Sequence, residues 1–238
     1  MKSASGKVID LYKMVAFDMD GTIGNTYPAF FRSIQLAMKD SFGKECTIEE
    51  ISHYLGINDL GIVKALAGDK WEKVFEDYVK YYDTITDPSP KLFEGMRKCV
   101  LELKYKGIKL ALITGKHPVT CNITLKKFGL EGAFDIIKTG AEDRNIKNES
   151  MSASVREMGM DKSDCCYIGD DLTDIYESEK AGIVCYSAAW SKTAEEVEEL
   201  ERVNPGKVFY KPQDFIDFIL AKLNRDRAEI IGYEKSSN

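Results

Sequence analysis

From residue 91 onwards, short apolar runs alternate with segments of helical periodicity. The runs IKLALIT (108–114), DCCYIGD (164–170) and IVCYS (183–187) are separated by amphipathic stretches such as PVTCNITLKKFG (118–129) and LTDIYESEKAG (172–182). Apolar runs of this kind are typical of strands that are buried on both faces, and the stretches between them are long enough for crossover helices. The pattern predicts an α/β fold, a parallel sheet with helices on both faces.

A second region of the chain has only helical periodicity. The run MVAF, residues 14–17, belongs to a first predicted strand over about 12–18, and helical spacing then continues from Tyr27 to about Thr84. The breaker TDPSP (86–90) ends this region. We therefore predict an α/β core formed by residues 1–26 and 91–238, with residues 27–90 inserted into it as a helical domain.

Composition limits the classes of partner. The 238 residues are 44% hydrophobic and 30% charged, which is ordinary for a globular protein, and no apolar run is long enough to span a membrane. The net charge of −6 argues against a nucleic-acid partner. The N-terminus lacks the order of a secretion signal, so we expect a cytoplasmic location with no membrane partner. Six scattered cysteines without a CxxC pair predict buried, reduced thiols.

Conspicuous polar residues follow three of the predicted strands. In a parallel sheet the carboxyl ends of the strands meet at one edge, which is where ligands bind. A single Asp or Thr at such a position is also typical of a helix cap. Capping does not explain two carboxylates in DxD spacing, because neighbouring anions resist burial unless a cation compensates them. The residues concerned are Asp18 and Asp20 after the first strand, Thr114, Gly115 and Lys116 after the second, and Asp170, Asp171 and Asp174 after the CCYIG strand.

These segments form a recognisable set of motifs. DMDGT (18–22), LITGK (112–116) and YIGDDLTD (167–174), in this order, resemble the signature motifs of the haloacid dehalogenase (HAD) superfamily. The segments LFEGMRKCVLELKYKGIKLALITGK and AFDIIKTGAEDRNIKNESMSASVREMGM resemble its phosphoglycolate-phosphatase-like branch, to which β-phosphoglucomutase relatives are similar. The resemblance covers about two-thirds of the chain. It implies a Rossmann-like core with a mobile, all-helical cap domain, which is the part expected at residues 27–90.

The resemblance also implies roles for the carboxylates. Asp18 would be the nucleophile that forms an aspartyl-phosphate, and Asp20 would protonate the leaving alcohol and later deprotonate the attacking water. Mg²⁺ would be bound by Asp18, by the main-chain carbonyl of Asp20 and by Asp170. Such a cation would explain why the chain tolerates the DxD pair.

Three further positions complete the site that the resemblance implies. Thr114 and Gly115 would bind the phosphoryl group through a hydroxyl and main-chain N–H groups. The cation of the third motif is expected at Lys147, with Arg144 and Lys138 as alternatives, since the proline that often follows this lysine is Asn148 here. Asp174 would lie beside the ligands and orient the lysine or metal-bound waters, and Asp171 would contact such waters or cap a helix.

Three functions remain open at this stage. The first is a Mg²⁺-dependent phosphatase, a phosphoric monoester hydrolase that acts on a small phosphorylated metabolite, with phosphoglycolate suggested by the family. The second is a phosphomutase similar to β-phosphoglucomutase. The third is a non-enzymatic, phospho-accepting signalling module, which the DxD spacing and the inserted domain disfavour. The segment SHYLGINDLG (52–61) lies where HAD relatives carry a specificity loop.

Overall fold

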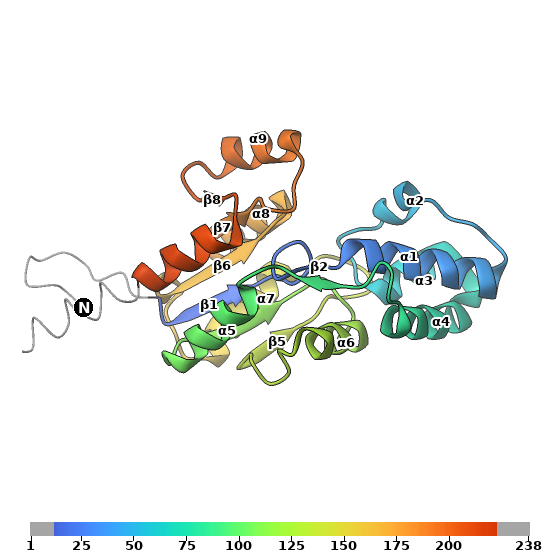
Figure 1. The fold of residues 1–238 in the computed structure, drawn as a ribbon, viewed down its shortest axis with the longest axis horizontal. Coiled ribbons are helices and arrows are strands. Elements are labelled where there is room, and N and C mark those ends of the chain that lie inside the picture. Colours follow the sequence, from blue (N-terminus) through green and yellow to red (C-terminus); the bar gives the residue numbers. More distant parts are fainter. Residues whose placement is uncertain (1–11, 223–238) are drawn as a thin grey trace, which may run out of the picture.

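The fold is a three-layer α/β core with a helical lobe at one end. The computed structural model describes residues 12–222, so residues 1–11 and 223–238 of the predicted core lie outside it. Within the described part, six parallel strands form one sheet in the order β5-β4-β1-β6-β7-β8, and the predicted fold class is confirmed (Figure 1). The strands are β1 (Met14–Phe17), β4 (Lys109–Ile113), β5 (Ile136–Lys138), β6 (Cys165–Gly169), β7 (Val184–Ala188) and β8 (Val208–Phe209).

The central strand β1 is buried on both faces of the sheet. Met14 pairs with Lys109 of β4 on one side and with Cys165 of β6 on the other. Val15 and Phe17 contribute to the hydrophobic core on one face, whereas Met14 and Ala16 contribute to the core on the opposite face. This alternation follows from the two-residue period of a strand, and it explains the continuous apolar run in the sequence.

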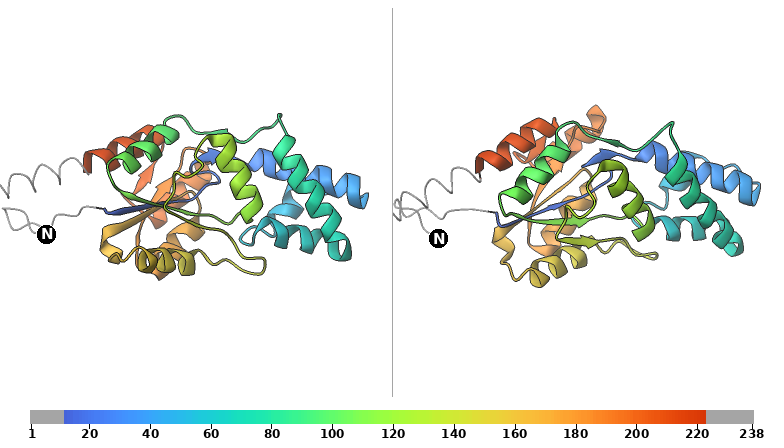
Figure 2. Two further views of the ribbon diagram at one scale, coloured as in Figure 1. Left: turned by 90° about the horizontal axis from the view of Figure 1, so that it is seen from below. Right: turned by 60° about the horizontal axis from the view of Figure 1, so that its bottom comes forward.

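Helices cover both faces of the sheet (Figure 2). The Val15 and Phe17 face packs against α5 (Met96–Tyr105), α6 (Pro118–Phe128) and a last helix that is described over residues 212–222. The Met14 and Ala16 face packs against α7 (Lys147–Glu157), α8 (Leu172–Ala181) and α9 (Ala194–Val203). The core therefore has the two-sided covering that the alternating sequence predicts.

Residues 27–84 form a lobe that contains helices and no strand. Its elements are α1 (Tyr27–Ala37), a π-helical turn (Met38–Phe42), α2 (Ile48–Ser52), α3 (Asp59–Ala67), a 3₁₀ turn (Gly68–Lys70) and α4 (Trp71–Thr84). The lobe has a hydrophobic core of its own, which includes Ile34, Val63 and Tyr78. We call this lobe the cap. It lies beyond the carboxyl ends of the strands, to the right of the sheet in Figure 1.

A two-stranded antiparallel ribbon joins the cap to the core. The chain enters the cap through β2 (Gly24–Asn25) and returns through β3 (Lys91–Leu92). A Cβ atom on Gly24 would lie 2.4 Å from the Phe128 ring, so a larger residue would push the ribbon away from α6. The sequence does not predict this ribbon, because two-residue strands have too few positions to show a period.

The cap is docked on the core through main-chain contacts. Asn58, in the segment before α3, donates its main-chain N–H to Ala141 O at 2.8 Å and its side-chain amide to Gly140 O at 2.9 Å. A Cβ atom on Gly61 would lie 2.1 Å from Glu142 O. Glycine at position 61 is therefore what allows α3 to approach this core loop so closely.

Two predictions from composition concern the thiols and the membrane. All six cysteines lie within the described range, where they are buried and form no disulfide, as predicted. Within residues 12–222, no helix is both long and apolar enough to cross a bilayer.

Candidate active site

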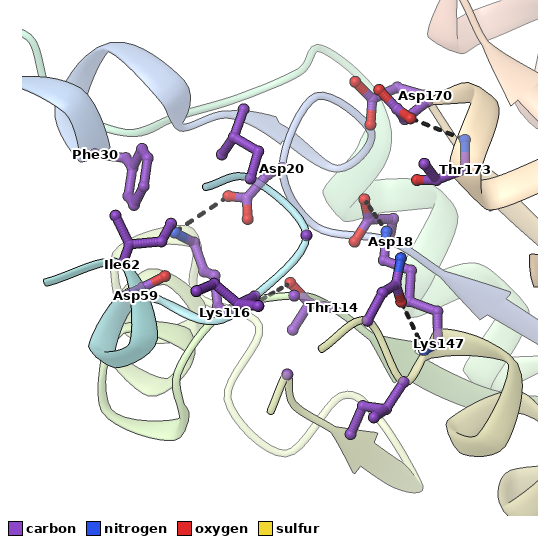
Figure 3. Close-up of a pocket in the computed structure, with 18 of the residues that line it drawn as sticks. Asp18, Asp20, Phe30, Asp59, Ile62, Thr114, Lys116, Lys147, Asp170 and Thr173 are labelled. Atoms are coloured by element: carbon purple, nitrogen blue, oxygen red, sulfur yellow. Dashed lines mark hydrogen bonds and ion pairs between the residues drawn. The ribbon is translucent and has the colours of Figure 1, made fainter. Parts of the chain in front are cut away.

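A cavity of about 280 Å³ lies between the carboxyl edge of the sheet and the cap. Three strand ends of the core and the start of α7 (Lys147–Glu157) supply most of its polar lining, and α1, α3 and the segment before α3 supply most of its apolar lining (Figure 3). The expected specificity segment reaches the cavity through Leu55, Gly56 and Ile57. The lining includes every predicted site residue except Asp174, namely Asp18, Asp20, Thr114, Gly115, Lys147, Asp170 and Asp171.

The turn after β1 sets the positions of the first carboxylates. Asp18 directly follows β1 and donates its main-chain N–H to Ile168 O at 2.9 Å, which keeps it in register with β6. Gly21 has φ +77°, and a Cβ atom there would lie 2.2 Å from Asp170 Oδ2. The glycine of the DMDGT motif therefore lets the turn bend back against the carboxylate that follows β6.

Lys147 connects two of the buried carboxylates. Its Nζ lies 2.6 Å from Asp174 Oδ1 and 3.1 Å from Asp18 Oδ2. Burial alone lowers the pKa of Lys147, but Asp174 and Asp18 raise it above its usual value, so the side chain is a cation. The two alternative cations lie elsewhere: Arg144 pairs with Glu149 and Asp143 on the surface, and Lys138 pairs with Glu157.

The pair of carboxylates at Asp18 and Asp170 has the character of a cation site. Burial raises the pKa of Asp18 well above its ordinary value despite the opposing charge of Lys147, and it raises the pKa of Asp170 to about 7 despite Lys192. Asp18 Oδ1 is buried and accepts no hydrogen bond from the described residues. Oxygens of Asp18, Asp170 and Asp174 lie within 4.8 Å of one another. This all-oxygen donor set with an unpartnered buried oxygen fits Mg²⁺.

Asp170 also has a partner that the sequence analysis misses. Lys192, in the loop after β7, places its Nζ 2.8 Å from Asp170 Oδ2. The side chain of Lys192 is only 12% exposed, and Ser191 beside it donates to Gly21 O at 3.0 Å. No local motif marks Lys192 in the sequence, because its relation to Asp170 depends on the pairing of β7 with β6.

Asp171 and Asp174 have different functions at the start of α8. The Asp171 side chain accepts a hydrogen bond from Thr173 N at 2.8 Å, so it caps the helix, which was one of its two expected roles. Asp174 Oδ2 accepts the Asp171 N–H at 3.1 Å, while Oδ1 contacts Lys147 and the Tyr167 hydroxyl. Asp174 is thus held on both oxygens and fixes the position of Lys147.

The second aspartate of the DxD pair contacts residues on the cap side of the cavity. Asp20 Oδ1 accepts a hydrogen bond from Thr26 and lies 3.3 Å from Lys116 Nζ. Lys116 is only 2% exposed, and its Nζ lies 4.7 Å from the ring centroid of Tyr82 and 5.6 Å from that of Phe30. Burial alone lowers the pKa of Lys116, but Asp20 and weaker neighbours raise it, so Lys116 is charged. The sequence places Lys116 at a strand end but does not indicate its contact with Asp20.

The Thr114 turn presents a hydroxyl to the cavity. Thr114 is 2% exposed, and its Oγ1 accepts the Lys116 N–H at 3.3 Å, which leaves the hydroxyl hydrogen available as a donor. The following helix α6 begins at Pro118, with His117 as its cap accepting from Val119 N at 3.3 Å. A hydroxyl and a helix start at one edge form a group of donors suited to an oxyanion.

Comparisons with known proteins agree with this geometry. The sequence profile of the haloacid dehalogenase-like hydrolases matches residues 15–188. Pyrophosphatase PpaX of Bacillus pumilus is 28% identical over 211 residues, which are 86% of this chain and 95% of that protein. A phosphoglycolate phosphatase of Neisseria meningitidis is 28% identical over 191 residues, 73% of this chain and 79% of the relative. The structure of CbbY from Rhodobacter sphaeroides in complex with phosphate superimposes with a TM-score of 0.72 at 16% identity, over 90% of this chain and 100% of that one.

The fold and the site define a hydrolase with an α/β core and a helical cap. The profile match spans well over half of the 238 residues, and the chain belongs to the haloacid dehalogenase-like hydrolase family. Within that family its relatives are phosphatases, and the chain is an enzyme of the phosphoric monoester hydrolase type.

Proposed function

We propose that this enzyme is a Mg²⁺-dependent phosphatase that hydrolyses a small phosphorylated metabolite through an aspartyl-phosphate on Asp18. The observation that carries the proposal is the ion pair of Asp18 with Lys147 at the floor of the cavity, with Asp20 two residues along the same turn. A nucleophile beside a fixed cation and a second carboxylate is the arrangement that a two-step displacement at phosphorus needs.

Asp18, Asp170 and the main-chain carbonyl of Asp20 would hold the Mg²⁺ ion. When bound, the ion would neutralise charge on the carboxylates and on the phosphoryl oxygens. The unpartnered, buried Asp18 Oδ1 supports this assignment. Asp174 is already held by Lys147, Tyr167 and a main-chain N–H, so we assign it the role of orienting Lys147.

The reaction divides among the side chains of this chain. Asp18 attacks phosphorus, and Lys147 and the Thr114 hydroxyl stabilise the negative charge on the phosphoryl oxygens. Asp20 gives a proton to the leaving oxygen and then takes one from the water that hydrolyses the aspartyl-phosphate. This returns Asp18 as a carboxylate and releases inorganic phosphate.

We keep the domain division expected from the sequence, residues 27–90 against residues 1–26 and 91–238, and the cap would move as a unit against the core. The separate hydrophobic core of the cap and the ribbon β2–β3 support a hinge at this junction. Closure would exclude water from the cavity and bring Phe30, Ile57 and Ile62 over the substrate.

The test is phosphate release from p-nitrophenyl phosphate with Mg²⁺ and with EDTA, in the wild type and in Asp18→Asn. We expect release with Mg²⁺ that EDTA abolishes and that Asp18→Asn lacks. Equal turnover of the wild type and Asp18→Asn would refute the proposed nucleophile. Conversion of a sugar monophosphate into an isomeric sugar monophosphate, primed by a sugar bisphosphate and without release of free phosphate, would indicate the phosphomutase alternative.

A panel of phosphorylated compounds then tests which substrate the enzyme hydrolyses. A cavity of about 280 Å³ lies at the small end of the range for ligand sites, which favours substrates of a few carbon atoms over nucleotides. Phosphoglycolate and pyrophosphate, named for the relatives, are the first two compounds to compare.

A further inference from the structure

A lysine outside the cavity contacts one of the proposed metal ligands. Asp170 lines the cavity together with Asp18 (Figure 3). Lys192, in the loop after β7, is only 12% exposed and places its Nζ 2.8 Å from Asp170 Oδ2, but it does not itself line the cavity. Because Lys192 lies outside the substrate cavity, its influence on the reaction must act through Asp170.

The fold fixes the backbone on both sides of Lys192. Ser191 donates its hydroxyl to Gly21 O at 3.0 Å, which ties the loop to the DMDGT turn. Thr193 is the N-cap of α9, where its side chain accepts the Glu196 N–H and its own N–H donates to Glu196 Oε2 at 2.8 Å. The side chain of Lys192 is therefore held between the turn that carries the catalytic carboxylates and the first turn of α9.

Lys192 provides the positive charge that is nearest to Asp170. Asp170 is 1% exposed, and among the described residues no other lysine or arginine nitrogen lies within 4.0 Å of its carboxylate oxygens. Lys147 pairs with Asp18 and Asp174 instead. A buried carboxylate is unfavourable without a compensating charge, which Lys192 supplies. A divalent ion on Asp170 would supply the same compensation and would be repelled by the ammonium group.

Lys192 has a second carboxylate within reach. Its Nζ lies 3.6 Å from Glu196 Oε1, and the Glu196 side chain is 49% exposed. The hydrogen bonds from Thr193 use the other oxygen, Oε2, so Oε1 is available to Lys192. The ammonium group can therefore exchange Asp170 for Glu196 and keep a negative charge beside it.

We propose that Lys192 is a positioning residue that competes with Mg²⁺ for Asp170. It compensates Asp170 before the metal binds and shifts toward Glu196 on metal binding, so it weakens the affinity of the site for Mg²⁺. The inference rests on the proposed function, because it takes Asp170 as a metal ligand. A lysine that only oriented Asp170 would strengthen metal binding, so the direction of the effect separates the two roles.

The experiment measures the affinity for Mg²⁺ directly, by calorimetric titration of the full-length enzyme after treatment with EDTA and buffer exchange, without substrate. Lys192→Met should bind Mg²⁺ about 10-fold more tightly than the wild type, because it removes a positive charge a few ångströms from the ion. Lys192→Arg keeps the charge and should resemble the wild type. Weaker or unchanged binding by folded Lys192→Met would overturn the inference.

Glu196→Gln tests the second position of the lysine, and it does so even if Lys192→Met fails to fold. Glutamine can replace glutamate at the start of α9, so the helix cap is kept while the charge is lost. Mg²⁺ should bind about threefold more weakly, the scale of a partly exposed ion pair. In a Lys192→Met background the same change should have no effect. Unchanged or tighter binding by Glu196→Gln, or an equal loss in both backgrounds, would overturn the inference.

Two controls separate this inference from the proposed function. Lys138→Met removes the same charge at the end of β5, on the other side of β1 from β6, where Lys138 pairs with Glu157. Its Mg²⁺ affinity should match the wild type, and a gain equal to that of Lys192→Met would overturn the inference. Asp170→Asn should abolish binding. If it does so but Lys192→Met binds no more tightly, only the inference about Lys192 fails. Binding that survives Asp170→Asn, or no binding by the wild type, would refute the proposed metal site itself.

Discussion

The two ends of the cavity hold their charges in different ways. At the core end, carboxylates from the β1 and β6 strand ends lie close together. Lys147 compensates Asp18 and Asp174, while Asp18 Oδ1 has no hydrogen-bond partner among residues 12–222. At the cap end, Lys116 lies 3.3 Å from Asp20 and close to the rings of Phe30 and Tyr82, and Asp59 also lines the cavity there. The difference leads us to propose that the two ends have separate functions. The core end would bind the metal and perform the chemistry, whereas the cap end would select the rest of the substrate.

The largest expected effect comes from the nucleophile at the core end. Asp18→Asn should lower kcat for p-nitrophenyl phosphate by about 10⁴-fold, as for the loss of other nucleophiles. The unfolding temperature should be unchanged or higher, because one of several crowded carboxylates becomes neutral. Steady-state kinetics and a thermal scan measure both quantities. Asp143→Asn, on the exposed surface, is the control and should match the wild type.

Loss of the core-end cation should affect both activity and stability. Lys147→Met should lower kcat by about 10³-fold, the scale of losing one group that stabilises transition-state charge. It should also lower the free energy of unfolding by roughly 3 kcal/mol, because Asp18 and Asp174 lose their compensating charge in a buried site. Urea denaturation measures the stability, with Lys138→Met and Arg144→Met as controls. If Arg144→Met lost as much activity as Lys147→Met, the assignment of Lys147 as the cation of the site would be contradicted.

A smaller effect should follow from a change in how the cap docks. In Gly61→Ala the new Cβ atom would meet Glu142 O, so α3 must shift away from the core loop. We expect kcat/KM to fall by about 10-fold because the cap residues that line the cavity are displaced. The chemistry at the core end should change little. Glu142→Ala removes the ion pair with Lys64 but leaves the carbonyl in place, and it should have less than about a twofold effect, as is usual for exposed ion pairs. A larger loss in Glu142→Ala than in Gly61→Ala would show that side-chain contacts dominate the docking.

The smallest expected effect is a pH dependence of stability at the core end. The folded-state pKa values of Asp18 and Asp170 are raised above those of the unfolded chain, that of Asp170 to about 7, so the native state binds more protons between about pH 4 and 7. In EDTA the unfolding temperature should therefore fall, by about 5 °C, as the pH rises through this window. Excess Mg²⁺ should reverse the fall, because it binds the ionised carboxylates of the native state. If the unfolding temperature of Asp170→Asn depended on pH as that of the wild type does, the raised pKa of Asp170 would not be the origin of the effect.

The sequence predicts the core end of the site much better than the cap end. Asp18 and Asp170 follow apolar strands, and a parallel sheet brings the ends of such strands together. The expected lysine at 147 lies beside Asp18, whereas Lys116 and Lys192 have partners that the sequence does not indicate. Their contacts depend on how separate loops and the cap pack, and no short-range period encodes this packing. The ribbon β2–β3 is not predicted either, because its two-residue strands are too short to show a period and its pairing joins residues far apart in the chain.

The central claim is that the phosphoryl group is transferred to Asp18. The direct measurement is rapid acid quenching of Asp20→Asn enzyme with substrate and Mg²⁺, followed by mass spectrometry of the peptides. Because this variant should hydrolyse the intermediate slowly, we expect the peptide that contains Asp18 to gain the mass of one phosphoryl group, and hydroxylamine to remove it. A phosphoryl group on another residue would contradict the account. Turnover by the quenched enzyme without any modified peptide would also contradict it, and so would turnover by Asp18→Asn.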